Sequence, residues 1–207
     1  MNTDAPRDLA HDLVQALPVA PGQLDALHAR LAAAAAAEGV LDVAYRTLDT
    51  PVGTLLLAAT ERGLVRVAYA SENHDAVLQT LADRISPRIL NAPARLDSTA
   101  AELDEYFAGR RHSFDLPLDW RLSAGFRATV LHHLATDLAY GQTASYSTVA
   151  QLAGNPKAVR AVGTACATNP LPVVVPCHRV VRADGSMGGY IGGAHAKRTL
   201  LTLETAA

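Results

Sequence analysis

Cysteine, histidine and arginine stand in direct succession at Cys177-His178-Arg179, and a carboxylate, Glu204, follows later in the chain. A base and nearby positive charge lower the pKa of a thiol and make it a nucleophile. The three residues follow an apolar, β-type run flanked by Pro172 and Pro176, which predicts a buried strand leading into them. A lone cysteine is more often an inert core residue, so the pattern favours a nucleophile without requiring one.

The composition is that of a globular protein in a reducing compartment. Of the 207 residues 49% are hydrophobic and 18% are charged, which excludes a disordered chain. The two cysteines, Cys166 and Cys177, are too few for a cysteine-rich zinc site or a disulfide framework. We therefore expect no metal, no cofactor and a cytoplasmic location. Residues Met1 to Asp12 carry acidic residues and no apolar core, so they predict no targeting signal, and no stretch predicts a membrane span.

Three segments are predicted from the change of pattern along the chain. Residues 1–41 are a helical extension of unknown role, with a helix over Gln23–Glu38 that Gly39 ends. Residues 42–120 are a small α/β module with an antiparallel sheet, whose role we expect to be structural. Its predicted strands are Val43–Leu48, Thr54–Thr60 and Leu64–Tyr69, and its predicted helices are Ala76–Ile85 and Thr99–Phe107.

The remaining segment, residues 121–207, is predicted to be mostly helical, so the fold class is mixed α/β (α+β). Two short helices, Ser147–Ala153 and Lys157–Thr168, are joined by Gly154-Asn155-Pro156. Short helices on either side of a tight turn are typical of a DNA-binding helix-turn-helix. The pattern alone is weak evidence, because similar corners occur in ordinary protein cores.

The second of these helices carries mostly small side chains after Arg160, in the run Arg160-Ala161-Val162-Gly163-Thr164-Ala165-Cys166-Ala167. A helix about 10–12 Å across enters a minor groove about 6 Å wide only if its side chains are small and the groove opens. The run therefore suits shallow, sequence-indifferent docking in the minor groove. A tightly packed helix pair would also favour small residues, so both interpretations stay open.

Several spaced motifs together resemble one family, the O6-alkylguanine-DNA alkyltransferases, also called methylated-DNA–protein-cysteine methyltransferases. The central motif is Pro176-Cys177-His178-Arg179-Val180, with Asn169-Pro170 before it. The other matching segments are Tyr140-Gly141, Gly154-Asn155-Pro156-Lys157-Ala158, Arg160-Ala161-Val162-Gly163, Gly189-Tyr190, Gly192-Gly193, Lys197, Glu204 and, more weakly, Thr50-Pro51-Val52-Gly53. The resemblance covers the C-terminal third densely.

The resemblance implies a single displacement in which Cys177 accepts the alkyl group from O6-alkylguanine in double-stranded DNA. His178, acting through a water, and Glu204 would form the proton relay that makes the thiolate. Histidine suits that relay because its pKa lies near neutrality and a carboxylate fixes its tautomer. Asn169 would tie the recognition helix to the active-site strand.

The resemblance also implies that the damaged base is flipped out of the duplex, which costs a few kcal/mol. Arg160 would take the place of the flipped base in the stack. Tyr146 would contact the 3′ phosphate, and its hydroxyl would form a hydrogen bond with the guanine ring. Tyr190 and Gly192 would wall the pocket, and Val180 would contribute backbone contacts. We expect a monomer that acts once, since a thioether has no good leaving group.

The chain departs from the family pattern at a few positions. Arg127 and Leu131 stand where the family often has glutamine and tryptophan, which leaves the packing between the two modules open. Ile191 stands where many members have serine, which leaves the preference among alkyl groups open, together with activity on O4-alkylthymine. Two alternative functions are a non-catalytic sensor of alkylated DNA, against which Cys177 argues, and a cysteine hydrolase. In a strand, adjacent side chains point apart, so a direct Cys177–His178 pair would have poor geometry.

Overall fold

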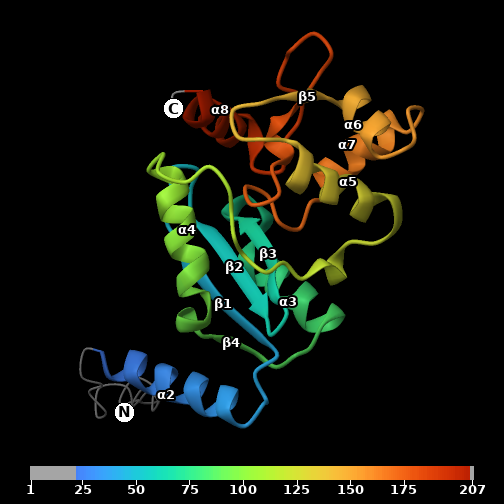
Figure 1. Ribbon diagram of the computed structural model, residues 1–207. Helices are drawn as coiled ribbons and strands as arrows, with labels where there is room; N and C mark the ends of the chain where they lie inside the picture. Colours follow the sequence, from blue (N-terminus) through green and yellow to red (C-terminus); the bar gives the residue numbers. More distant parts are fainter. Residues whose placement is uncertain (1–21, 206–207) are drawn as a thin grey trace, which may run out of the picture.

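The computed structural model describes residues 22–205, so the prediction made for Met1 to Asp12 lies outside the described residues. A four-stranded sheet with helices on both faces forms one half, and a helical domain sits at one end of that sheet (Figure 1). No helix among the described residues is long and apolar enough to cross a membrane. The predicted mixed α/β class is confirmed.

The sheet has the strand order β3-β2-β1-β4. Its strands are β1 (Val43–Leu48), β2 (Leu55–Thr60), β3 (Gly63–Tyr69) and β4 (Ile89–Asn91). The first three strands are antiparallel neighbours as predicted, but β4 runs parallel to β1. The predicted antiparallel sheet is confirmed for these three strands. Strand β4 was not predicted, because a three-residue strand is too short to show an alternating pattern.

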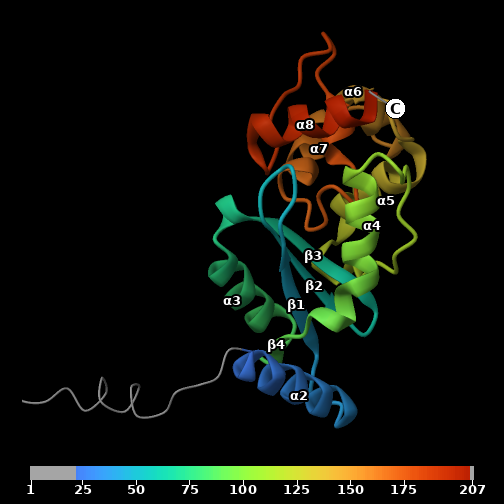
Figure 2. The ribbon, with the colours of Figure 1, turned by 90° about the vertical axis from the view of Figure 1, so that its left-hand side faces the viewer.

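Two helices cover opposite faces of the sheet (Figure 2). Helix α3 (His74–Arg84) buries Val77 and Leu81 on one face, and α4 (Asp97–Phe107) buries Leu103 and Tyr106 on the other. The α4 face is continuous with the core of the helical domain. That shared core fixes the helical domain on the sheet.

The N-terminal helix α2 (Gln23–Ala37) packs near β4 through a small patch that includes Ala35. Its leucines at helical spacing, Leu24, Leu27 and Leu31, are 55%, 48% and 54% exposed. The helix is present as predicted, but its apolar repeat is not the face that packs. The helix lies at the end of the sheet opposite the helical domain (Figure 1).

The helical domain contains the predicted pair of short helices, α6 (Tyr146–Leu152) and α7 (Val159–Ala167). Helices α5 (Gly125–Asp137) and α8 (Gly193–Thr205) complete it, with the short parallel strands β5 (Ala144–Ser145) and β6 (Val180–Val181). Helix α7 packs against both α5 and α6.

The run before Cys177 is not the buried strand that its apolar residues predicted. Residues 171–175 form turns, and Cys177–Arg179 is one turn of 3-10 helix. Three prolines remove backbone donors that a strand would need. Val173 adopts a φ of 72°, a left-handed conformation that is unusual for a β-branched residue. The chain therefore enters the site as a compact loop held by side chains.

Candidate active site

Asn169 holds the loop that carries Cys177. Its amide nitrogen Nδ2 donates to the Val175 carbonyl at 2.9 Å and lies 3.2 Å from the Cys177 sulfur. Its carbonyl oxygen Oδ1 accepts from the Leu171 backbone N–H at 2.9 Å. One fully buried side chain thus closes the turn from helix α7 to the cysteine. These contacts connect the end of helix α7 to the loop that carries Cys177, and no strand takes part in them.

His178 and Glu204 form a buried pair behind the cysteine. His178 Nε2 lies 2.8 Å from Glu204 Oε1, and both side chains are almost completely buried. Burial, above all, lowers the His178 pKa. Burial raises the Glu204 pKa, but the hydrogen bonds and charges of His178 and Arg179 together outweigh it and hold that pKa well below its usual value. An ionised carboxylate only accepts hydrogen bonds. Nε2 of His178 therefore carries a hydrogen and donates a hydrogen bond to Glu204.

The other ring nitrogen of His178 is consequently a bare acceptor. Nδ1 is buried and has no hydrogen-bond partner among the residues that the structure describes. A buried polar atom without a partner carries a free-energy cost, and a small hydrogen-bonding molecule such as water relieves it. His178 is therefore poised to take a proton at Nδ1.

Burial raises the pKa of Cys177 to about 11, although the Asn169 hydrogen bond and the Lys197 charge oppose the shift. The side chain is 2% exposed. The free protein therefore holds a neutral thiol at pH 7, beside a neutral histidine. A reaction at this sulfur at pH 7 therefore requires a base that removes the thiol proton. Among residues 22–205, no cluster of histidine, cysteine and acidic residues could hold a metal ion.

Two residues that the sequence analysis did not assign complete the carboxylate's environment. Arg179 donates to both oxygens of Glu204 at 2.9 Å, from Nε and from one terminal nitrogen. The hydroxyl of Tyr106, from helix α4, donates to Glu204 Oε1 at 2.7 Å. Arg179 lies in the cysteine motif itself, which was a signal for its role. Tyr106 carried no such signal, because it lies 98 positions away from Glu204.

The glycine-rich segment before α8 lies against two tyrosines. A Cβ added to Gly188 would lie 3.0 Å from the Tyr146 hydroxyl, and one added to Gly192 would lie 2.5 Å from the ring of Tyr69. The hydroxyls of Tyr190 and Tyr69 are 3.0 Å apart. Tyr146, Tyr190 and Gly192 are thus brought together at one loop, and Tyr69 of the sheet module joins them.

Val180 follows the cysteine motif and begins β6. Its carbonyl accepts from Lys197 Nζ at 2.7 Å, and the Lys197 side chain is completely buried. The ammonium also lies 3.4 Å from the Gly189 carbonyl, so it joins β6 to the glycine-rich loop. Lys197 therefore uses one of the Val180 backbone groups that were expected to face the pocket.

Arg160 lies apart from the buried cluster, on the outer face of helix α7. Arg160, Ala161, Thr164 and Ala167 are all exposed. A Cβ added to Gly163 would meet nothing within 4 Å, so no neighbouring helix requires a glycine there. Packing accounts for the small buried residues of α7 but does not account for Gly163 and the small exposed ones.

Comparison with known proteins identifies the family. Residues 125–206 match the family model described as 6-O-methylguanine DNA methyltransferase, DNA binding domain. Residues 43–120 match the ribonuclease-like domain of the same methyltransferase. The chain belongs to the 6-O-methylguanine DNA methyltransferase family.

Individual members of this family are similar over most of their length. The methylated-DNA–protein-cysteine methyltransferase of Mycolicibacterium paratuberculosis is 38% identical over 78% of this chain and 92% of its own. The mouse (Mus musculus) enzyme of that name is 38% identical over 76% of this chain and 78% of its own. The crystal structure of Mycobacterium tuberculosis OGT in complex with DNA matches with a TM-score of 0.69 and 37% identity, covering 79% of this chain and 93% of that chain.

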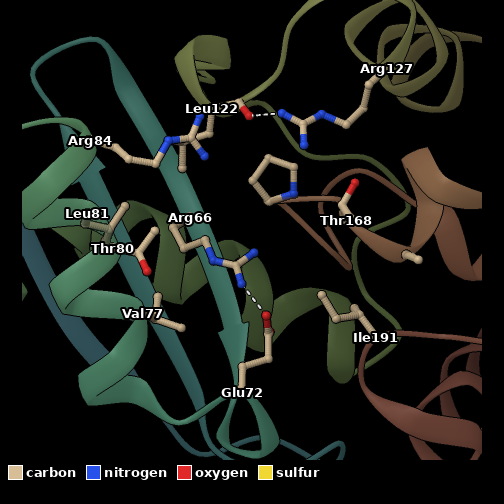
Figure 3. Close-up of a pocket in the computed structure, with 12 residues that line it drawn as sticks. Arg66, Glu72, Val77, Thr80, Leu81, Arg84, Leu122, Arg127, Thr168 and Ile191 are labelled. Carbon is tan, nitrogen blue, oxygen red and sulfur yellow. Dashed lines mark hydrogen bonds and ion pairs between the residues drawn. The ribbon is translucent and has the colours of Figure 1, made fainter.

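A cavity lies at the interface between the sheet module and the helical domain. Its volume is about 320 Å³, and it lies between α3 and β3 on one side and the end of α7 and Ile191 on the other (Figure 3). Arg66, Arg84 and Arg127 line it, and Arg66 forms an ion pair with Glu72. Cys177 is not among its lining residues. The cavity therefore belongs to the junction of the halves and not to the thiol.

Proposed function

We propose that Cys177 is the residue to which this methylated-DNA–protein-cysteine methyltransferase transfers the alkyl group of O6-alkylguanine in duplex DNA. The observation that carries the proposal is the buried set of Cys177, His178 and Glu204, in which the His178 Nδ1 acceptor has no partner. The sulfur forms a bond to the alkyl carbon as the bond from that carbon to O6 breaks. The thiol proton passes through a water to His178 Nδ1. The departing guanine anion takes up one proton from solvent, and His178 returns one proton to solvent, so the protons balance.

The relay suits a thiol that is neutral before the reaction. His178 stays unprotonated at pH 7 because burial lowers its pKa, and Glu204 stabilises the imidazolium once the proton arrives. Arg179 and Tyr106 hold the carboxylate in place. Glu204 therefore works by orienting and stabilising His178, as the acidic member of such an arrangement does.

The DNA-facing surface in this proposal is the outer face of helix α7 with Tyr146. The small exposed residues of α7 allow a close approach to an opened minor groove, and Arg160 is free to enter the duplex in place of the flipped base. Tyr190 and Gly192 wall the pocket that receives the base. Phosphate contacts supply most of the affinity, so binding depends on salt and little on sequence.

We further propose domain boundaries at 42–120 and 121–207, with residues 1–41 as an extension. The protein works as a monomer, and its two cysteines, both free and buried in the structure, suit a cytoplasmic location. Ile191 lines the interface cavity. The resemblance implies a serine hydroxyl near the alkyl oxygen at this position in many members, so here only a backbone N–H could serve.

The test is the stoichiometry of transfer from a duplex that contains O6-methylguanine. Since a thioether has no good leaving group, we expect one methyl group per protein molecule, located by peptide mapping on Cys177. Cys177→Ala abolishes transfer and keeps duplex binding, because helix α7 is untouched.

Cys166→Ala is the matched control, because Cys166 is also buried and burial raises its pKa even further. It loses only packing and transfers at the wild-type rate. Several methyl groups removed per molecule, or label on Cys166, would contradict the proposal. Hydrolysis of simple esters without transfer would favour a cysteine hydrolase.

A further inference from the structure

The side chain of Tyr69, the last residue of β3, joins the sheet module to the glycine-rich loop. Tyr69 is 3% exposed and packs edge-on against Tyr190, with ring centroids 5.8 Å apart and an angle of 76°. The two hydroxyls lie 3.0 Å apart, and either could be the donor. A ring pair and a hydrogen bond thus join Tyr190 to a residue 121 positions away.

The same ring also fills the space beside Gly192. A Cβ on Gly192 would lie 2.5 Å from the Tyr69 ring, closer than any real contact. The absence of a side chain at Gly192 is therefore what allows Tyr69 to reach Tyr190. Tyr69 contacts both residues that the proposed function assigns to the wall of the base pocket.

Tyr69 is itself held by the end of β3. Its backbone N–H donates to Glu72 Oε1 at 2.9 Å, and Glu72 forms an ion pair with Arg66 (Figure 3). Arg66 also lies 3.4 Å from the Asn169 carbonyl. One strand end therefore supports both the loop that carries the cysteine and the loop that carries Tyr190.

We propose that Tyr69 is a positioning residue for alkyl transfer, which fixes the Tyr190 side chain and the glycine-rich loop in the geometry that receives the alkylated base. This inference rests on the proposed function of Tyr190 as a pocket residue. It assigns to the sheet module an indirect part in the reaction, where the sequence indicated only a structural one. Tyr69 acts through Tyr190 and Gly192, and the hydrogen bond of its hydroxyl is with Tyr190.

A double-mutant cycle on Tyr69 and Tyr190 tests this inference, with single-turnover methyl transfer from an O6-methylguanine duplex as the readout. A net hydrogen bond of about 1 kcal/mol corresponds to about fivefold in rate. Tyr69→Phe keeps the ring and removes the hydroxyl, so we expect transfer to slow about fivefold. Because the hydroxyl acts only through its partner, Tyr69→Phe has no further effect in a Tyr190→Phe background.

A matched control is Tyr45→Phe, because Tyr45 lies in the same sheet but packs against the opposite core. It transfers at the wild-type rate. A second readout is the alkylation of Cys177 by iodoacetamide, followed by peptide mapping. That rate is unchanged in Tyr69→Phe, because the substitution removes only the hydroxyl that lies beside Tyr190 and keeps the ring pair in place.

The inference is overturned if Tyr69→Phe transfers at the wild-type rate, or if its effect multiplies with that of Tyr190→Phe. It is also overturned if slower transfer comes with faster iodoacetamide alkylation, since a loosened interface would then be the cause. A wild-type protein that transfers no methyl group to Cys177 contradicts the proposed function itself.

Discussion

At the scale of single residues, the Glu204 carboxylate joins the reacting site to the rest of the protein. It accepts hydrogen bonds from His178, Arg179, Tyr106 and the Gly141 backbone, and its side chain is 1% exposed. A buried charge of this kind is tolerated only when it is paired and fully hydrogen-bonded. The same contacts keep the carboxylate ionised. Its negative charge then stabilises His178 when the histidine is protonated.

The relay predicts a change in pH dependence when the histidine is removed. With His178→Ala only the pre-formed thiolate reacts, and the Cys177 pKa of about 11 makes that form scarce at neutral pH. We expect transfer at pH 7 to slow by at least about 100-fold. The remaining rate should rise about tenfold per pH unit between pH 7 and 9, whereas the wild-type rate should change little there.

The measurement is the single-turnover rate against pH for wild type, His178→Ala and Glu204→Gln, with duplex binding measured in parallel. Binding should change far less than the rate, because neither side chain lies on the exposed face of α7. Identical pH profiles for all three proteins would contradict a proton relay through His178 and Glu204.

At the scale of elements, a larger residue on the exposed face of α7 should leave the folding of the protein intact but weaken its binding to duplex DNA. Gly163 lies within the helix with open space beside it, so Gly163→Ala should stabilise the protein by about 0.5–1 kcal/mol. Gly163→Leu should also fold normally, yet weaken duplex binding at least tenfold because the side chain fills the space that the groove needs.

Thermal unfolding and duplex titration at fixed salt measure the two effects separately. Ala165→Leu is the contrasting variant, because Ala165 on the buried face is 1% exposed and overpacking there costs about 1–3 kcal/mol. If Gly163→Leu binds duplex as tightly as wild type, α7 does not face the minor groove.

Most of these elements could be predicted from the sequence, since segments such as α3 and α4 carry their pattern locally. Strand β4 could not, because three residues show no period, and the loop before Cys177 could not, because apolar residues and prolines suggest a buried strand. Asn169, His178 and Glu204 were found through spaced motifs. Tyr69 and Tyr106 were missed because their partners lie 121 and 98 positions away and no local pattern marks such contacts.

At the scale of the whole molecule, the two halves share one core and several polar contacts. The Val67 backbone N–H donates to the Pro170 carbonyl at 2.8 Å, and Tyr106 reaches Glu204 across the same interface. The core cluster runs from Leu55 and Leu57 of the sheet to Val162 and Leu200 of the helical domain. Such continuity favours unfolding as one cooperative unit.

Acid should therefore unfold both halves together, with Glu204 as one of the groups responsible. Its pKa is lowered in the folded protein, so its stabilising contribution is complete above the unfolded value of about 4.3 and is lost as the pH falls below it. One extra proton bound by the unfolded state corresponds to about 1.4 kcal/mol per pH unit. Glu204→Gln should be less stable than wild type at pH 7 by about 3–5 kcal/mol. Between pH 4 and 3, its unfolding free energy should fall less steeply than that of wild type, by about 1.4 kcal/mol per pH unit.

Denaturant titrations at each pH measure that slope. Fluorescence of the single tryptophan, Trp120, reports on the segment between the halves, and the reactivity of Cys177 toward 4,4′-dithiodipyridine reports on the helical domain. Both signals should change at the same denaturant concentration in wild type, because Tyr106 and the shared core link the sheet module to the relay. Separate midpoints would mean that each half is stable alone and that the interface contributes little. Equal slopes for wild type and Glu204→Gln would mean that the carboxylate is not ionised through its contacts with Arg179 and His178.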